Sequence, residues 1–233
     1  MRLAPPSLAP ATLGRPLRRP VEFSNGAHRA LGVGSPLRYA AGVRLAYHMM
    51  SAPQPIGLLF LARTAKGLRY LEFMNRKSLK RMIASRPDVG PDTVWEPSLL
   101  ELKSITEQLE SYFLGTLREF EIPLDPVGSE FQVKVWGELS RIPFAETRTY
   151  GEIARAVGQP KAARAVGLAN NHNPIAIVVP CHRVIGANGS LTGYGGGMNR
   201  KRWLLEHEAR HGHPVARPGD LFAATGSQGG RRG

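Results

Sequence analysis

Hydrophobic positions in the first half of the chain predict a short set of strands followed by helices. Apolar runs at 43–49, 56–63 and 67–74 are typical of strands, and the short turn between the last two favours an antiparallel hairpin. Helical spacing of apolar residues predicts a helix near 76–85 and a longer one at about 97–115. Strands and helices in this order indicate a small α+β domain.

The second half of the chain is more helical. The segment Ser129-Glu130-Phe131 is expected to open a helix that runs to about Leu139. One face of this helix is apolar, as expected for an element that packs against a core. The residues of that face are Phe131, Val135, Trp136 and Leu139.

Two further short helices are predicted around a tight turn. Thr149 suits an N-cap, and Glu152 stands three residues further on, in the position of a capping box. The helix that begins there (TYGEIARAVG) is followed by a turn at 158–160 and a second helix (KAARAVGLAN). The pair matches a helix-turn-helix, although the same hairpin is equally common as a plain structural unit without DNA binding.

The remainder of this half has three recognisable parts. Residues 175–179 form a short apolar run that ends at Pro180, and 186–197 form a glycine-dense loop. A last helix is expected from about Asn199 to Glu208. Its buried side is expected to consist of Trp203, Leu204 and Leu205.

Composition divides the chain into four segments. Residues 1–44 and 211–233 lack a sustained hydrophobic period, and we expect a disordered basic extension and a disordered tail there. Between them we expect an N-terminal α+β domain at 45–125 and a mainly helical domain at 126–210. A transit peptide, or a start codon nearer Met49, is an alternative reading of the N-terminal extension.

The formal net charge of +13 points to an anionic partner, but much of it lies at the ends of the chain. Seven Arg against one Glu give +6 over 1–44, and 209–233 carry +3. Residues 45–125 have ten basic and ten acidic side chains, whereas 126–208 have ten basic and six acidic ones. The basic bias of the interior therefore belongs to the part with the helix pair, as expected for nucleic-acid binding.

The cysteine count and the absence of long apolar runs narrow the class of protein. A single cysteine excludes an intramolecular disulfide and a multi-cysteine zinc site, and it is compatible with a reducing compartment. No stretch reaches the roughly 18 uninterrupted apolar residues of a membrane helix. We therefore expect a cytoplasmic protein that does not associate with a membrane.

The candidate chemistry lies in Pro180-Cys181-His182-Arg183, where the only cysteine precedes a histidine. Only a few per cent of an ordinary thiol is thiolate at neutral pH, so a nucleophilic cysteine needs a base or a positive field. Adjacent side chains in an extended loop point to opposite sides, so a bridging water is an alternative to a direct Cys–His contact. Without further context, a small buried cysteine with no chemical role is the commoner outcome.

The context of this motif resembles a known family. The segment IVVPCHRVI at 177–185, with TGYGGG and RKRWLLEHE further on, closely resembles the O6-alkylguanine-DNA alkyltransferases. The resemblance covers about 45–208 and is densest from Phe131 to Glu208, where PCHR occurs with its flanking elements in the family's order and spacing. It implies an α+β fold: a ribonuclease-H-like domain with a short antiparallel sheet, then a winged helix-turn-helix domain that binds DNA and accepts the alkyl group.

The resemblance also implies roles for the residues around the cysteine. Cys181 matches the alkyl acceptor, His182 matches the residue that acts on it through a water, and Glu208 matches the carboxylate that holds the histidine. Tyr150 matches the tyrosine that donates a proton toward the guanine and crowds the backbone phosphate. Asn173 matches the hinge asparagine that braces the turn before the cysteine loop.

Further matches concern the DNA and the substrate pocket. Arg164 matches the arginine finger that fills the gap left by a flipped base, and the small residues Ala162 and Ala163 would let their helix approach the minor groove closely. Val184 would offer its backbone carbonyl to the base. The pocket is expected to be formed by Pro180, Val184, Tyr194 and Gly195.

The implied reaction is an SN2 displacement in which the Cys181 thiolate attacks the alkyl carbon and guanine leaves. The thioether has no hydrolytic exit, so each molecule should act once, without a metal or a cofactor. The implied partner is double-stranded DNA with O6-alkylguanine, bound by a monomer; activity on O4-alkylthymine and the preferred alkyl size are left open.

The sequence departs from some members of the family. It has no cysteine in its N-terminal half, so we expect neither the structural zinc nor the phosphotriester-repair domain that certain members carry. Ala176 and Thr192 stand where certain members have Pro and Gly, which affects the width of the pocket. Three other functions remain to be separated by experiment: a non-catalytic lesion binder, a helix-turn-helix regulator and a Cys–His hydrolase.

Overall fold

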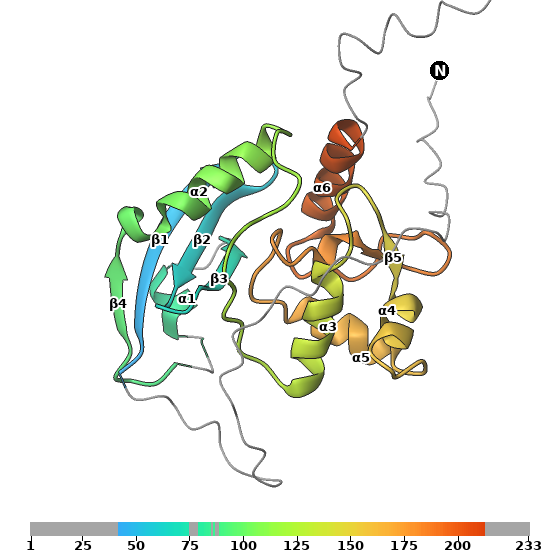
Figure 1. The fold of residues 1–233 in the computed structure, drawn as a ribbon, viewed down its shortest axis with the longest axis horizontal. Helices are drawn as coiled ribbons and strands as arrows, with labels where there is room; N and C mark the ends of the chain where they lie inside the picture. Colours follow the sequence, from blue (N-terminus) through green and yellow to red (C-terminus); the bar gives the residue numbers. More distant parts are fainter. Residues whose placement is uncertain (1–41, 75–78, 85, 87–88, 213–233) are drawn as a thin grey trace, which may run out of the picture.

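The computed structural model describes residues 42–74, 79–84, 86 and 89–212 of the chain. The predictions of disorder for 1–41 and 213–233 lie outside these residues. Within them, the chain forms an α+β structure with a sheet domain followed by a helical domain, so the predicted fold class is confirmed (Figure 1).

The N-terminal part contains a mixed four-stranded sheet in the order β3-β2-β1-β4. Its strands are β1 (Arg44–Ala52), β2 (Gly57–Arg63), β3 (Leu68–Phe73) and β4 (Val94–Pro97). The three predicted strands are present and pair in antiparallel fashion, whereas β4 pairs in parallel with β1 and was not predicted. Three of the four residues in β4 are exposed, so it carries no alternating apolar signal.

The expected N-terminal extension overlaps the first strand by one residue. Arg44, assigned to the extension, begins β1, and its guanidinium forms ion pairs with Glu96 at 2.6 Å and Glu101 at 2.7 Å. These contacts join β1 to β4 and to the helix that follows.

Two helices accompany the sheet: α1 (Leu79–Ala84) and α2 (Leu99–Phe113). Figure 1 shows α2 lying across the face of β1 and β2. Ser98 caps α2 by accepting a hydrogen bond from the Glu101 amide, as expected at an N-cap. The buried side of α2, which packs against the sheet, comprises Leu102, Ile105, Thr106, Leu109 and Tyr112.

The C-terminal part contains four helices, a short parallel strand pair and one 3-10 turn. The helices are α3 (Glu130–Ser140), α4 (Tyr150–Ala156), α5 (Ala163–Asn171) and α6 (Met198–His211), the strands are β5 (Arg148–Thr149) and β6 (Val184–Ile185), and the turn is η1 (Cys181–Arg183). The predicted helix pair corresponds to α4 and α5, and both capping boxes that start α3 and α4, at Ser129 and Thr149, are formed.

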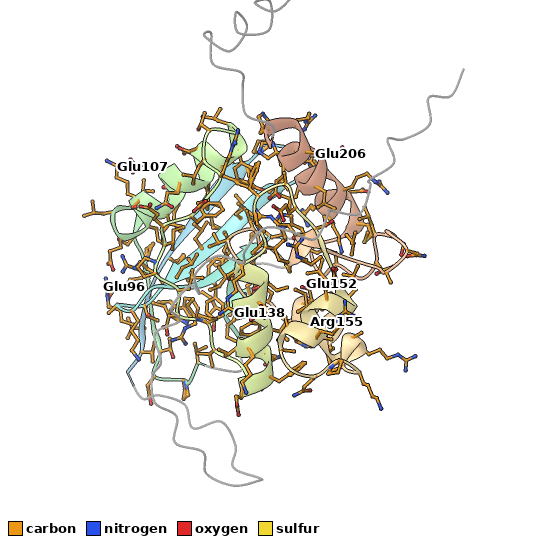
Figure 2. All side chains as sticks on the ribbon, turned by 45° about the vertical axis from the view of Figure 1, so that its right-hand side comes forward. Glu96, Glu107, Glu138, Glu152, Arg155 and Glu206 are labelled. Atoms are coloured by element: carbon orange, nitrogen blue, oxygen red, sulfur yellow. The ribbon has the colours of Figure 1, made fainter. Side chains whose placement is uncertain are left out.

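The two parts of the molecule share one edge of the sheet. Backbone hydrogen bonds join Leu68 in β3 to Pro123 and Asp125, and join Leu71 to Pro174 and Ala176, at 2.8–2.9 Å. The apolar run at 175–179 does not form a separate strand. Its first residue pairs with β3 through an isolated bridge. Side chains fill the space between sheet and helices, and one apolar cluster extends across both parts (Figure 2). The sheet thus supports the segment that leads to Cys181.

None of the helices that the structure describes has the length and apolar composition needed to cross a membrane.

Replacing Thr149 with Ala tests the capping box that starts α4. The side chain of Thr149 accepts a hydrogen bond from the Glu152 amide at 3.2 Å, and its own amide donates to the Glu152 carboxylate at 2.7 Å. Loss of such a cap costs about 1 kcal/mol, so Thr149→Ala should lower the free energy of unfolding by about that amount in a denaturant titration. Thr149→Ser retains the hydroxyl and should stay near the wild type. Equal stability of all three proteins would contradict the cap.

Candidate active site

Cys181 lies at the start of η1 and is 4% exposed. It contributes to the lining of a cavity of about 790 Å³ that both parts of the molecule surround. The sheet contributes Phe73, and the glycine-dense loop contributes Tyr194 and Gly196. A Cβ at Gly196 would come within 2.5 Å of the Phe73 ring, so this position of the loop requires glycine.

Polar contacts hold the backbone that leads to the cysteine. Asn173 donates through Nδ2 to the Val179 carbonyl at 2.8 Å, and its Oδ1 accepts from the Ile175 amide at 3.0 Å. Asn170 donates to the carbonyl of Cys181 itself at 3.1 Å. Asn173 therefore contacts the backbone on both sides of the turn before Cys181, whereas Asn170 is a second support that the sequence analysis did not identify.

The imidazole of His182 is completely buried and its two nitrogens have different environments. Nε2 lies 2.8 Å from Glu208 Oε1, which accepts a hydrogen bond, so Nε2 carries the proton. Nδ1 is buried without a hydrogen-bond partner among the described residues. Burial lowers the pKa of His182, against the opposing charge of Glu208, so the neutral ring keeps a free lone pair on Nδ1.

Glu208 is the centre of the polar network. Besides His182, its carboxylate accepts two hydrogen bonds from the Arg183 guanidinium at 2.8 Å, one from the Tyr112 hydroxyl at 2.8 Å and one from the Ala145 amide at 3.1 Å. Burial alone would raise the pKa of Glu208, but the hydrogen bonds from His182 and Arg183 and the positive charge of Arg183 hold this pKa well below its usual range. The carboxylate is therefore ionised although it is fully buried.

The thiol itself is not ionised at rest. Burial raises the pKa of Cys181, while hydrogen-bonding groups of Asn173 and Tyr194 and the charge of Lys201 oppose this rise. The thiol thus needs a proton acceptor when it reacts. The next residue, His182, has such an acceptor in its free Nδ1.

Lys201 in α6 is a buried cation on the other side of the cysteine loop. Its Nζ donates to the Val184 carbonyl at 2.6 Å and to the Thr192 carbonyl at 3.1 Å, and no part of the side chain is exposed. Burial lowers the pKa of Lys201 to about 8, although the nearby Cys181 opposes the shift. At neutral pH the ammonium group is mostly charged and favours a thiolate.

The residues expected to meet DNA lie further out. Tyr150 begins α4, is half-buried, and donates through its hydroxyl to the Thr192 carbonyl at 3.0 Å. Arg164 is exposed on α5, close to the half-buried Ala162 and Ala163. The buried residues around Cys181 and the residues expected to meet DNA are therefore separate in the structure. The loop at Thr192 connects the two groups.

The residues that were expected to form the pocket differ in their exposure. Pro180 and Val184 are buried, Tyr194 is half-buried, and Gly195 is exposed. Tyr194 and Gly195 line the cavity together with Cys181. The Val184 carbonyl, expected to meet the base, already accepts a hydrogen bond from Lys201 and has one further lone pair for a ligand.

Three residues of the network were not identified from the sequence: Tyr112, Arg183 and Lys201. Helical spacing could have identified Lys201. It stands three residues before the buried Leu204 and seven before the buried Glu208, so it lies on the same face of α6. Tyr112 had no such signal, since its contact with Glu208 joins residues 96 positions apart.

A buried thiol, a neutral imidazole and an ionised carboxylate, in a domain that carries a helix-turn-helix pair, define a DNA-directed protein with cysteine chemistry. Two family models match the chain: the ribonuclease-like domain of 6-O-methylguanine DNA methyltransferase at residues 46–126, and the DNA-binding domain of the same protein at residues 130–210. The chain therefore belongs to the 6-O-methylguanine DNA methyltransferase family, which repairs DNA by methyl transfer from O6-methylguanine to a cysteine of the protein.

Individual relatives agree with this assignment over most of their length. A methylated-DNA–protein-cysteine methyltransferase of Methanosarcina acetivorans is 51% identical over 154 residues, which are 66% of this chain and 93% of that protein. A relative with the same name from Mycolicibacterium paratuberculosis is 54% identical over 157 residues, or 67% of this chain and 89% of that protein.

Solved structures support the same conclusion. The O6-methylguanine methyltransferase of Mycobacterium tuberculosis superposes with a TM-score of 0.64 at 47% identity, covering 73% of this chain and 96% of that one. The Mycobacterium tuberculosis protein in complex with DNA gives a TM-score of 0.60 at 46% identity, covering 77% of this chain and 98% of that one.

Replacing Lys201 with Met tests the influence of its charge on the thiol. Loss of the cation should raise the pKa of Cys181 and slow labelling of the only cysteine by iodoacetamide at pH 7, on the order of tenfold for each pKa unit. The difference should shrink as the pH rises through about 8, because Lys201 of the wild type then loses its own charge. Labelling rates are read from intact mass against time between pH 6 and pH 9.5.

Arg202→Met is the matched control, since this neighbouring cation is exposed. It should label like the wild type at every pH. A constant ratio between Lys201→Met and the wild type across the pH range would refute the electrostatic explanation.

Proposed function

We propose that Cys181 is the cysteine that receives the methyl group. It is the only cysteine of the chain, and it lines the large cavity beside a buried histidine whose free nitrogen can accept a proton. The observation that carries the proposal is that this thiol directly precedes His182, whose imidazole is held by the hydrogen bond to Glu208 at 2.8 Å.

In the proposed mechanism, the proton of the Cys181 thiol passes to Nδ1 of His182 through one water. Glu208 stabilises the imidazolium that results, because its carboxylate is ionised and accepts from Nε2. The thiolate attacks the methyl carbon, so the S–C bond forms while the bond from carbon to O6 breaks. The bonding electrons of that bond pass to the guanine.

The departing guanine takes up a proton, and we propose the Tyr150 hydroxyl as its donor. Burial raises the pKa of Tyr150, so the hydroxyl is protonated before the reaction. Solvent afterwards exchanges protons with Tyr150 and His182 and restores their resting states. The thioether on Cys181 has no hydrolytic exit, so each protein molecule acts once, and the reaction uses no metal and no cofactor.

The lesion must leave the helix to reach this sulfur. Cys181 is 4% exposed, so a base that stays stacked in a duplex is out of its reach, and base flipping at a cost of a few kcal/mol is required. We propose that α5 enters the minor groove, that the small Ala162 and Ala163 permit a close approach, and that Arg164 fills the vacated position. The exposure of Arg164 supports this arrangement, and the complex of the Mycobacterium tuberculosis relative with DNA supports DNA as the partner.

Several finer points of the proposal await direct tests. We propose that Asn173 keeps the cysteine loop in place, that Val184, Tyr194, Gly195 and Pro180 form the base pocket, and that the protein acts as a monomer. O4-alkylthymine is proposed as a second substrate. A lone reactive thiol needs a reducing compartment, which supports a cytoplasmic location.

Methyl transfer is tested by incubating the full chain with a duplex that contains one O6-methylguanine. We expect the intact mass to rise by one methylene equivalent, about 14 Da, on Cys181 and to stop at one per protein, because the thioether is stable. Cys181→Ala should show no gain. A duplex with O4-methylthymine, in a parallel reaction, tests the second substrate.

The same experiment separates the competing functions. Tight lesion binding without a mass gain would indicate a non-catalytic damage binder, and the absence of both would favour a sequence-specific regulator. Repeated turnover without modification of the protein would indicate a hydrolase.

Replacing Arg164 with Ala tests the finger. The rate of methyl transfer from duplex DNA should fall by on the order of tenfold or more, because the stacking vacancy is no longer filled and flipping costs a few kcal/mol. Transfer from the free base O6-methylguanine should be unchanged, because no flipping is needed. Arg155→Ala removes an exposed arginine from α4 and serves as the charge-matched control (Figure 2). Equal losses in both variants would mean that only total charge matters.

A further inference from the structure

The polar network around the cysteine includes a donor from the sheet domain. Tyr112 belongs to the last turn of α2, and its side chain is completely buried. Its hydroxyl donates to Glu208 Oε1 at 2.8 Å, and this oxygen also accepts from His182 Nε2 and from Arg183 Nη2 at the same distance. The ribonuclease-like part of the chain thus reaches the carboxylate that orients the histidine.

The position of this hydroxyl is fixed by aromatic packing. The Tyr112 ring lies 5.4 Å from Phe120, 6.0 Å from Phe144 and 5.3 Å from His207, measured between ring centroids. Its backbone carbonyl accepts a hydrogen bond from His207 Nε2 at 2.8 Å. Both ends of the residue are therefore held against the C-terminal part, and the hydroxyl has little freedom to turn away from Glu208.

The protonation state of Tyr112 suits a permanent donor. Burial and the charge of Glu208 raise the pKa of Tyr112 well above its usual value, so the phenol keeps its proton at neutral pH. Within the described residues, the other donors to Glu208 come from the C-terminal part: Ala145, His182 and Arg183. Tyr112 is the contribution of the sheet domain to this group.

We propose that Tyr112 is a positioning residue for alkyl transfer, through which the sheet domain controls the geometry of the His182–Glu208 pair. Without its hydroxyl, Oε1 loses one of three donors inside a buried site. The carboxylate then takes in water or turns toward Arg183, and the hydrogen bond to His182 Nε2 weakens. His182 is then a less well-oriented acceptor for the thiol proton of Cys181. This inference rests on the proposed roles of Cys181 and His182.

Tyr112→Phe tests the inference, because it removes the hydroxyl and keeps the packed ring. At pH 7 we expect the rate of methyl transfer from an O6-methylguanine duplex to fall by about tenfold, while the affinity for the same duplex is unchanged. The pH profile of iodoacetamide labelling of Cys181 should move to higher pH, since proton removal becomes harder. Circular dichroism and a thermal melt establish that the variant is folded.

Tyr47→Phe is the matched control. It makes the same change in the same part of the chain, but Tyr47 lies in β1 beside Phe60 and Trp95, in a second apolar cluster that does not include Cys181. We expect its transfer rate to stay within twofold of the wild type. An equal loss in both variants would assign the effect to general destabilisation and overturn the proposal.

A double variant separates positioning through Glu208 from other causes. If Tyr112 acts through this carboxylate, Tyr112→Phe should slow Glu208→Gln no further, whereas independent effects would multiply. A multiplied loss, a folded Tyr112→Phe with wild-type rate and pH profile, or a fall in DNA affinity equal to the fall in rate would each overturn the proposal. Methyl transfer by the wild type is measured in the same series, so a failure of the proposed acceptor is recognised separately.

Discussion

The structure depends on the ionised carboxylate of Glu208, which is fully buried. A buried charge is tolerated only when hydrogen bonds and counter-charges replace its hydration, and removal of one partner typically costs about 3–5 kcal/mol. Here five hydrogen bonds reach the two oxygens, from α2, from the loop after α3 and from η1. These segments must therefore arrive together, and the cysteine loop is fixed as part of that arrangement.

The same arrangement explains two unusual backbone conformations. Ala145, with φ 62°, directs its amide at Glu208, and Ile177, with φ 71°, lies between the Asn173 brace and Cys181. A residue with a side chain in the left-handed region costs on the order of 1–3 kcal/mol, which surrounding structure has to offset. The ladder between Leu71 and the segment 174–176, together with the contacts of Asn173, supplies such support for the cysteine loop. Strain is thus found beside the buried carboxylate of Glu208 and in the segment that leads to Cys181.

Local patterns allowed much of the fold to be predicted from the sequence, but not the contacts between distant segments. The capping boxes at Ser129 and Thr149 and the three antiparallel strands follow from short-range spacing, and all are present. The strand β4 was missed because its four residues are mostly exposed and therefore lack an alternating apolar pattern. Tyr112 was missed because a tyrosine in the apolar stripe of α2 looks like any core residue until the partner of its hydroxyl is known.

Burial has opposite consequences for the two neighbouring groups: it raises the pKa of the thiol, which stays protonated, and lowers that of the histidine, which stays neutral. One carbonyl links the surface of the site to its interior. The Thr192 carbonyl accepts from the Tyr150 hydroxyl at the rim and from the Lys201 ammonium in the core. The position of the glycine-dense loop at Thr192 is therefore tied both to the start of α4 and to α6. The free protein thus stores a protonated thiol next to a histidine whose Nδ1 is free to accept its proton.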